Sequence, residues 1–245
     1  MKVAVIPCLF VLVGCVFAKP EAGSIASVCN AEDEECVKES LKTFLRTTSQ
    51  GIPAFDVRPL DPNVIPRINY TLGAFGVGYT FNNLTVTGMK NLRLAEYNID
   101  RAAKTSLIKT EATLDYVSDV EIDYLKLGKV FTGKYTGAGK ALVTVKYPYG
   151  ITTDDKGVQH FDVQQETIEC EPVEASGGFN EELLKAMNDD PQVAEIRSKL
   201  EEAKDKEAAL KAGFCRLAKT VFTTFVHNIR ASAKGLPKEA FFKNI

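Results

Sequence analysis

The sequence contains few residues that could carry out catalysis. His160 and His227 are its two histidines, and neither belongs to a His-x-x-x-His or Cys-x-x-Cys spacing of the kind that binds metal ions. No Gly-x-Ser-x-Gly segment, the nucleophile turn of α/β-hydrolases, occurs. His160 lies in a strand-like stretch and His227 in an apolar helix, which favours a structural role for each. These residues therefore predict a protein that is not an enzyme and that holds no metal and no cofactor.

Two tyrosines are better placed to bind a ligand. Tyr147 and Tyr149 continue an alternation that includes Val143 and Val145, so these side chains are expected on the interior face of one strand. A phenol at the edge of an apolar surface can donate one hydrogen bond to an isolated ligand oxygen. The alternative is that both rings only pack, with their hydroxyls bonded to backbone or water, and Pro148 between them could shift the register. The pattern favours an apolar cavity with one or two polar groups, which suits a mainly apolar ligand that carries an acceptor oxygen.

A sheet is needed to position these side chains. Apolar and polar residues alternate in several runs between residues 76 and 169, and turn residues separate the runs. No helical pattern lies between the runs, so the strands are expected to form an antiparallel meander with one apolar face. The glycine-rich residues 137–140 complete no nucleotide fingerprint, and we interpret them as a turn or a glycine bend within a strand.

The chain on either side of this region is expected to be irregular. Pro59, Pro62 and Pro66 predict an extended or turning segment before the sheet. Residues 176–178, Ser-Gly-Gly, predict a loop after it.

Helical spacing occurs near both ends of the chain. From Glu34 to Thr48 the apolar residues fall on one stripe, which includes Leu41, Phe44 and Leu45. Beyond the sheet, two modest helical stripes are divided by residues 189–191, Asp-Asp-Pro. From residue 214 to 229 apolar side chains, Phe222 and Phe225 among them, cover most of the helix circumference. Such a helix must be buried on most sides, although it is too short and too interrupted by charge to span a membrane.

The apolar sheet face and this last helix can bury each other. We therefore expect an α+β fold in which a highly curved antiparallel sheet wraps around a long C-terminal helix, with a short amphipathic helix near the N-terminus. Such a wrap seldom fills completely, and its open ends are natural apolar pockets. The helix that carries Leu41, Phe44 and Leu45 could be a mobile gate over a pocket mouth, and an ordinary covering helix is the alternative.

The first residues have the layout of a secretory signal peptide. Met1 and Lys2 precede an uncharged apolar run from Val3 to Phe17, and cleavage is expected after Ala18. Residues 1–18 are thus predicted as the signal peptide and residues 19–245 as a single ligand-carrier domain. Two sequons, at Asn69 and Asn83, are possible glycosylation sites of a secreted chain.

Four cysteines remain after this cleavage, namely Cys29, Cys36, Cys170 and Cys215. An even number in a secreted chain indicates disulfides, and four cysteines allow three pairings. The formal charge of −2 argues against nucleic acid or an anionic membrane as the main partner.

Several segments resemble the juvenile hormone-binding/takeout family of insects. They are Cys29-x6-Cys36, residues 51–62 (GIPAFDVRPLDP), residues 83–88 (NLTVTG), residues 154–161 (DDKGVQHF) and residues 226–234 (VHNIRASAK). The resemblance covers essentially the whole chain from Cys29 to Ile245, although residues 179–212 match only in general helical character. It implies a long helix wrapped by a curved sheet, as in tubular lipid-binding folds, and a pocket near one end covered by the N-terminal helix.

The resemblance also implies roles for individual residues. It implies the disulfides Cys29–Cys36 and Cys170–Cys215, and it places the hydroxyl of Tyr149 against the epoxide of the hormone. The matching segments do not define the apolar wall of the pocket, and our own choices for it are Val143, Val145, Phe161, Phe222 and Phe225.

The sequence as a whole predicts a secreted haemolymph carrier that binds juvenile hormone in an internal apolar pocket, transports it and protects it from degradation. Its expected partner is this small apolar ligand or a similar terpenoid or lipid. It is expected to be a monomer that binds no nucleic acid and does not associate stably with membranes. The alternatives are a takeout-like carrier of another lipid or odorant, a hydrolase of the same hormone, and an interaction module whose tube is filled by side chains.

Overall fold

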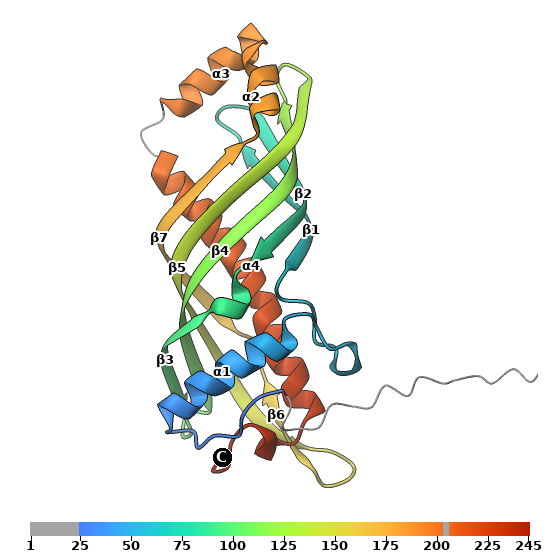
Figure 1. Ribbon diagram of the computed structural model, residues 1–245, viewed down its shortest axis with the longest axis vertical. Coiled ribbons are helices and arrows are strands. Elements are labelled where there is room, and N and C mark those ends of the chain that lie inside the picture. The colour runs from blue at the N-terminus through green and yellow to red at the C-terminus, as the bar shows by residue number, and fades with distance from the viewer. Residues whose placement is uncertain (1–24, 203–205) are drawn as a thin grey trace, which may run out of the picture.

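Two very long antiparallel strands form the spine of the molecule. In the computed structural model, which describes residues 25–202 and 206–245, β4 (Thr105–Tyr124) has 20 residues and β5 (Lys129–Thr153) has 25. They pair without interruption from Tyr124 opposite Lys129 to Thr105 opposite Pro148. Because a strand rises about 3.3 Å per residue, this ribbon makes the molecule elongated (Figure 1). The predicted signal peptide, residues 1–18, lies outside the described residues.

Five shorter strands complete a seven-stranded sheet in which every pairing is antiparallel. On one side of β4, β2 (Val77–Thr87) pairs with residues 115–124, which we call the far half, and β1 (Asn63–Leu72) pairs with the outer edge of β2. On the same side, β3 (Arg93–Asp100) pairs with residues 105–111, the near half. On the other side, β6 (Gln159–Val163) pairs with residues 149–153 of β5 and β7 (Thr167–Phe179) with residues 135–146. The predicted antiparallel meander is confirmed.

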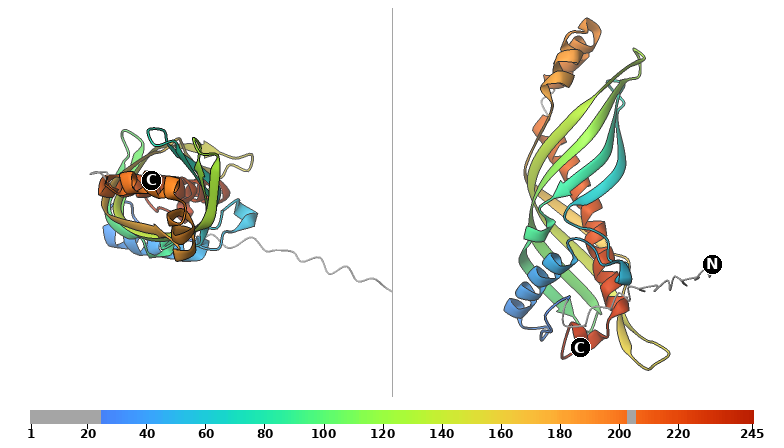
Figure 2. Two further views of the ribbon diagram at one scale, coloured as in Figure 1. Left: turned by 90° about the horizontal axis from the view of Figure 1, so that it is seen from above. Right: turned by 45° about the vertical axis from the view of Figure 1, so that its right-hand side comes forward.

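The sheet curls around one long helix. Helix α4 (Lys206–Gly235) has 30 residues and runs along the concave face of the sheet, as the view from above shows (Figure 2). Apolar side chains on several of its sides are buried, since β5, β6 and β7 all contact it. The α+β fold expected from the sequence, a curved sheet wrapped around a long C-terminal helix, is therefore confirmed. The buried residues of α4 are Phe214, Leu217, Ala218, Val221, Phe222, Phe225, Val226, Asn228, Ser232 and Ala233.

Shorter helices cover the two ends of the tube. Helix α1 (Glu34–Thr48) lies across the end that holds the C-terminus, and its bounds agree with those predicted. Helices α2 (Glu181–Asn188) and α3 (Pro191–Glu201) lie at the opposite end, where they pack on a second apolar cluster that includes Val120, Ile122 and Tyr124 of β4. Three short 3-10 helices, η2 (Pro53–Phe55), η3 (Met89–Asn91) and η4 (Lys238–Ala240), lie in connecting segments.

The strands extend further than the sequence predicts. Pro66, expected in an extended or turning segment, lies within β1, which tolerates it because β1 is an edge strand and Pro66 has no partner in the register with β2. Residues 176–178, expected as a loop, belong to β7. The missing side chain of Gly177 leaves room for the ring of Tyr135, whose Oη would lie 2.1 Å from a Cβ at this position.

Both disulfides implied by the resemblance are present. Cys29–Cys36 closes a short loop at the start of α1, and Cys170–Cys215 joins β7 to α4. The first bond holds the start of α1 beside the chain that precedes it. The second holds the central helix against one edge of the sheet.

Candidate ligand-binding site

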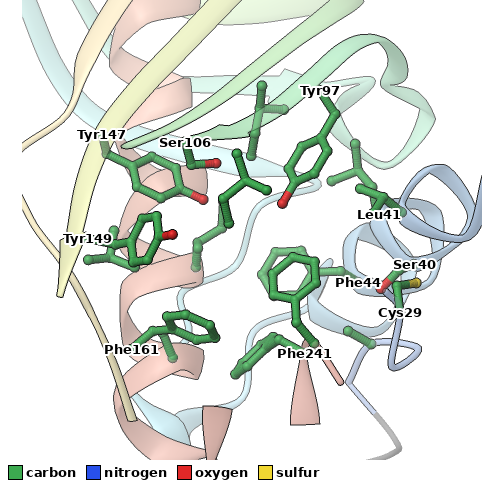
Figure 3. Close-up of a pocket in the computed structure, with 18 of the residues that line it drawn as sticks. Cys29, Ser40, Leu41, Phe44, Tyr97, Ser106, Tyr147, Tyr149, Phe161 and Phe241 are labelled. Atoms are coloured by element: carbon green, nitrogen blue, oxygen red, sulfur yellow. The ribbon is translucent and has the colours of Figure 1, made fainter. Parts of the chain in front are cut away.

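An apolar cavity lies beneath α1, at the end of the tube that holds the C-terminus (Figure 3). Its volume is about 140 Å³. One ordered water needs about 10–15 Å³, so this space is larger than a water site by an order of magnitude. Side chains from α1, β3, β4, β5, β6, α4 and the C-terminal segment surround it. The lining residues are Ala26, Cys29, Val37, Ser40, Leu41, Phe44, Leu94, Tyr97, Ile99, Ser106, Ile108, Tyr147, Tyr149, Phe161, Val163, Ile229, Ala233, Phe241 and Phe242.

The sheet places four hydroxyl groups on the wall of this cavity. Alternation along β5 turns Tyr147 and Tyr149 toward the interior, where they are 9% and 6% exposed. Ser106 of β4 stands directly opposite Tyr147, and Tyr97 of β3 stands opposite Ile108, so Tyr97 is a diagonal neighbour of Ser106. Diagonal neighbours are within reach of a large side chain. The labelled hydroxyl groups point toward the middle of the cavity in Figure 3.

Aromatic rings make up much of the remaining wall. Phe161 lies edge-on to Tyr149 with ring centroids 5.7 Å apart, and it contacts Phe241 and Phe242 in the same manner at 6.2 and 6.1 Å. Tyr97 stacks on Phe242 at 6.4 Å. Such contacts add to the stability of the wall beyond the burial of area, so it is expected to be well ordered.

Helix α1 covers the cavity and is well specified by its own sequence. The side chain of Asp33 caps the helix by accepting a hydrogen bond from the Cys36 amide at 3.1 Å. Glu34 and Glu35 lie in the first turn, where their negative charges interact favourably with the positive end of the helix dipole. Its apolar stripe turns Leu41 and Phe44 into the cavity.

The C-terminal segment fastens the start of α1 from below. Cys29 donates a backbone hydrogen bond to the Phe241 carbonyl at 3.1 Å and accepts one from the Lys243 amide at 2.9 Å. Asn244 accepts a bond from the Ala31 amide at 3.0 Å and donates one to the Glu32 carboxylate at 2.6 Å. Phe241 and Phe242, on this segment, are at the same time lining residues. Segments from both ends of the described chain thus border the cavity together.

The site is electrically neutral. Every described residue that lines the cavity has an uncharged side chain. Burial raises the pKa of Tyr97, Tyr147 and Tyr149 above the usual value of a phenol, and for Tyr97 and Tyr147 an interaction with Ser106 offsets part of the rise. All three phenols therefore stay protonated at neutral pH and can donate hydrogen bonds. The arrangement suits a neutral, mainly apolar molecule that carries an acceptor oxygen.

The structure brings together some of the residues chosen from the sequence. Tyr149, Phe161, Leu41 and Phe44 line the cavity. Other chosen residues lie in the surrounding core without lining the cavity, each fully or almost fully buried, and contact between them and a ligand stays a prediction. These residues are Leu45, Val143, Val145, Phe222 and Phe225.

Several lining residues were not found by sequence reasoning. Leu94, Tyr97 and Ile99 lie on β3, where a register shift between Leu94 and Glu96 interrupts the alternation that would have marked an inward face. Phe241 and Phe242 lie in a short segment without periodicity. The only available signal was a pair of adjacent phenylalanines near the C-terminus.

The remaining candidate residues lie outside the cavity. Asn69 and Asn83, the two sequon asparagines, are exposed on the far half of the sheet. His160 bonds through Nδ1 to the Leu236 carbonyl at 2.8 Å, and His227 bonds through Nε2 to the Asp56 carbonyl at 2.9 Å. His160 thus ties β6 to the residue that follows α4, and His227 of α4 binds the loop after η2.

The described residues contain neither a metal-binding cluster nor a membrane-spanning helix. Within residues 25–202 and 206–245, no group of three His, Cys, Asp or Glu residues is arranged to hold a metal ion. In the same residues, no helix combines the length and the apolar character needed to cross a membrane.

Comparison with known proteins gives consistent results. The profile of the haemolymph juvenile hormone binding protein family matches residues 8–165. The juvenile hormone-binding protein of Manduca sexta is 34% identical over 227 residues, which cover 92% of this chain and 98% of that protein. The crystal structure of Takeout 1 from Epiphyas postvittana superposes with a TM-score of 0.66 at 17% identity, over 88% of this chain and 99% of that one. At that identity the match to Takeout 1 establishes the fold alone.

Proposed function

Since this chain belongs to the haemolymph juvenile hormone binding protein family, we propose that it is a secreted carrier that binds a juvenile hormone in the cavity beneath α1. The observation that carries the proposal is the neutral, largely apolar cavity with inward-facing phenols. A sesquiterpenoid ester or epoxide is neutral, apolar along most of its length and able to accept hydrogen bonds. Burial of its chain would contribute about 25 cal/mol per Å² of apolar area before the costs of association are subtracted.

We propose further that the protein acts as an extracellular, monomeric carrier without turnover. Residues 19–245 would form a single carrier domain after removal of the signal peptide. A bound hormone would be shielded from adsorption and from hydrolytic enzymes, because the cavity is covered by α1 and the C-terminal segment. The Tyr149 hydroxyl would bind the ligand oxygen, and α1 would act as the gate.

The direct test is to identify what the protein carries. Lipid extracted from the protein purified under mild conditions from its native source should contain a juvenile hormone, and native mass spectrometry should show one hormone per chain. Titration calorimetry should give tighter binding for the hormone than for a fatty acid of similar length. A fatty acid or an odorant that binds more tightly would point to a different carrier function.

A second measurement separates carriage from hydrolysis. Incubation of the pure protein with radiolabelled hormone should leave the ester intact. Release of the acid in proportion to protein concentration would contradict the proposal and support the hydrolase alternative.

A further inference from the structure

Three hydroxyl groups in the cavity wall, those of Tyr97, Ser106 and Tyr147, lie on the paired strands β3, β4 and β5, and the proposed function gives them no separate roles. Ser106 stands directly opposite Tyr147 in the pairing of β4 with β5 and diagonal to Tyr97 of β3, and it lies 4% exposed at the wall between them. Buried polar groups in proteins almost always have hydrogen-bond partners. Counting protons therefore shows what this group of three can still do.

The count leaves one donor free. Three hydroxyls have three protons, and one hydrogen bond between Ser106 and each of the two phenols would use two of them. Both phenols line the cavity, but Tyr147 is 9% exposed whereas Tyr97 is half-buried, so we assign the remaining proton to Tyr97, the more accessible of the two. The order of donation is then from Tyr147 to Ser106, from Ser106 to Tyr97, and from Tyr97 into the cavity. Each bond of such a chain strengthens the next.

Tyr149 supplies a second free donor. Its side chain is 6% exposed and lines the cavity, and its hydroxyl points into that space (Figure 3). In the close-up, Tyr149 and Tyr97 reach into the cavity from opposite sides, one from β5 and the other from β3 (Figure 3). An ether or carbonyl oxygen has two lone pairs and can accept a hydrogen bond from each side.

We propose that Tyr97 is a second ligand-binding donor, held in position by Ser106 and Tyr147, and that together with Tyr149 it selects a neutral ligand by a single acceptor oxygen at one end. The inference rests on the proposed carrier function and adds to it which residues determine specificity. The oxygen-bearing end of the ligand lies between β3 and β5, and its apolar chain lies against Phe44, Phe161 and Phe241. Ser106 is a positioning residue, since it acts through Tyr97.

Two ligands that differ by one oxygen test this assignment. Methyl epoxyfarnesoate and methyl farnesoate are the same ester with and without the epoxide, and calorimetry gives the ratio of their affinities for each variant. Tyr97→Phe should reduce this ratio by about fivefold, the equivalent of one hydrogen bond, while the affinity for methyl farnesoate changes little. The double variant Tyr97→Phe/Tyr149→Phe should bind both ligands about equally.

Two further variants separate binding from packing. Tyr116→Phe is the matched control, because the Tyr116 hydroxyl bonds to the Ser176 carbonyl away from the cavity, and it should leave the ratio unchanged. Ser106→Ala should lower the ratio and Ser106→Thr, which keeps the hydroxyl, should restore it. Melting curves of all variants check that the fold is retained.

The outcomes are distinguishable from a failure of the proposed function. If the wild-type protein binds neither ester, the carrier function and the inference both fail. If it binds both esters but Tyr97→Phe leaves the ratio unchanged, or weakens both ligands equally, Tyr97 has a packing role only and the inference alone is overturned.

Discussion

Single positions determine where the interior of this protein is filled by side chains and where it stays open. The phenol of Tyr149 is buried, protonated and directed into an apolar space, an arrangement that favours a ligand with an acceptor oxygen. On the far half of the sheet, Gly137 leaves the space that the ring of Tyr116 fills, because a Cβ on Gly137 would lie 2.4 Å from that ring. Both features are properties of single positions, and each can be tested by a single substitution.

Tyr149→Phe should weaken hormone binding by about 1 kcal/mol, the contribution of a typical hydrogen bond. The substitution keeps the ring and its edge-on contact with Phe161, so the melting temperature should not fall. Calorimetric titration of both proteins with the hormone measures the difference. Equal affinities would remove Tyr149 from the site.

Gly137→Ala should destabilise the fold by about 1–3 kcal/mol, as overpacking of a core does. Gly178→Ala is the matched control, since Gly178 also lies in a strand but a Cβ there would meet nothing within 4 Å. Urea unfolding followed by circular dichroism gives both values. A Gly137 variant as stable as the control would show that the Tyr116 ring can move aside.

At the scale of elements, the cover of the cavity consists of α1 and the segment that holds it. The start of α1 is joined by Cys29–Cys36 to a strand-like contact with residues 241–243. Glu32 adds contacts to Asn244 and to Arg101 in the turn between β3 and β4. At the other end of α1, the Ser49 carbonyl accepts bonds from the amides of Leu60 and Asp61. A gating motion would have to break one of these two sets of contacts.

Asn244→Ala should raise the rate of hormone release several-fold, because it removes the side-chain bonds to Ala31 and Glu32 that hold the start of α1. Stopped-flow transfer of bound hormone to lipid vesicles measures this rate. Lys243→Ala is the control, since Lys243 contributes its backbone amide to the contact with Cys29 and the substitution keeps that bond. Equal release rates for all three proteins would place the moving part elsewhere.

The whole molecule is a tube with two different ends. One end contains the cavity, whereas at the other α2 and α3 pack on apolar side chains of β2, β4 and β5. Between the two ends, the curled sheet surrounds much of α4 (Figure 2). The disulfide Cys170–Cys215 joins this helix to β7. Buried phenols occur along the full length, and burial is the main cause that raises the pKa of each shifted tyrosine.

These phenols predict a loss of stability at alkaline pH. A group with a raised pKa in the folded state contributes stability that is complete below its unfolded pKa, about 10 for tyrosine, and that is lost as the pH rises through the folded value. For Tyr79 burial raises the pKa to about 12, so the free energy of unfolding should fall between these two values. Urea unfolding at a series of pH values tests this, and Tyr79→Phe should reduce the slope. A stability that stays constant across this range would contradict the prediction.

Much of the fold could be predicted from the sequence because it depends on local periodicity. The stripe from Glu34 to Thr48 predicts α1 with its observed bounds, and alternation predicts the inward faces of β4 and β5. Apolar side chains cover nearly the whole circumference of the helix at residues 214–229, so this helix must be buried. Because one sheet has an apolar face to cover, the sheet is expected to curl around the helix. The strands at Pro66 and Gly177 were missed because local propensity argues against them, and only pairing with a neighbouring strand stabilises them there.

The composition of the cavity was decided by the tertiary structure. Burial of an aromatic residue can be predicted from its pattern, but whether its ring fills the core, as that of Phe222 does, or borders a space, as that of Phe161 does, depends on how distant segments meet. Tyr97 lies on β3, where a register shift interrupts the alternation that would identify the inward face. Phe242 is placed at the cavity wall by its bridge to Cys29, which lies near the other end of the described chain. Periodicity follows from the geometry of one element, whereas an enclosed space depends on the packing of several elements whose relative positions no local pattern contains.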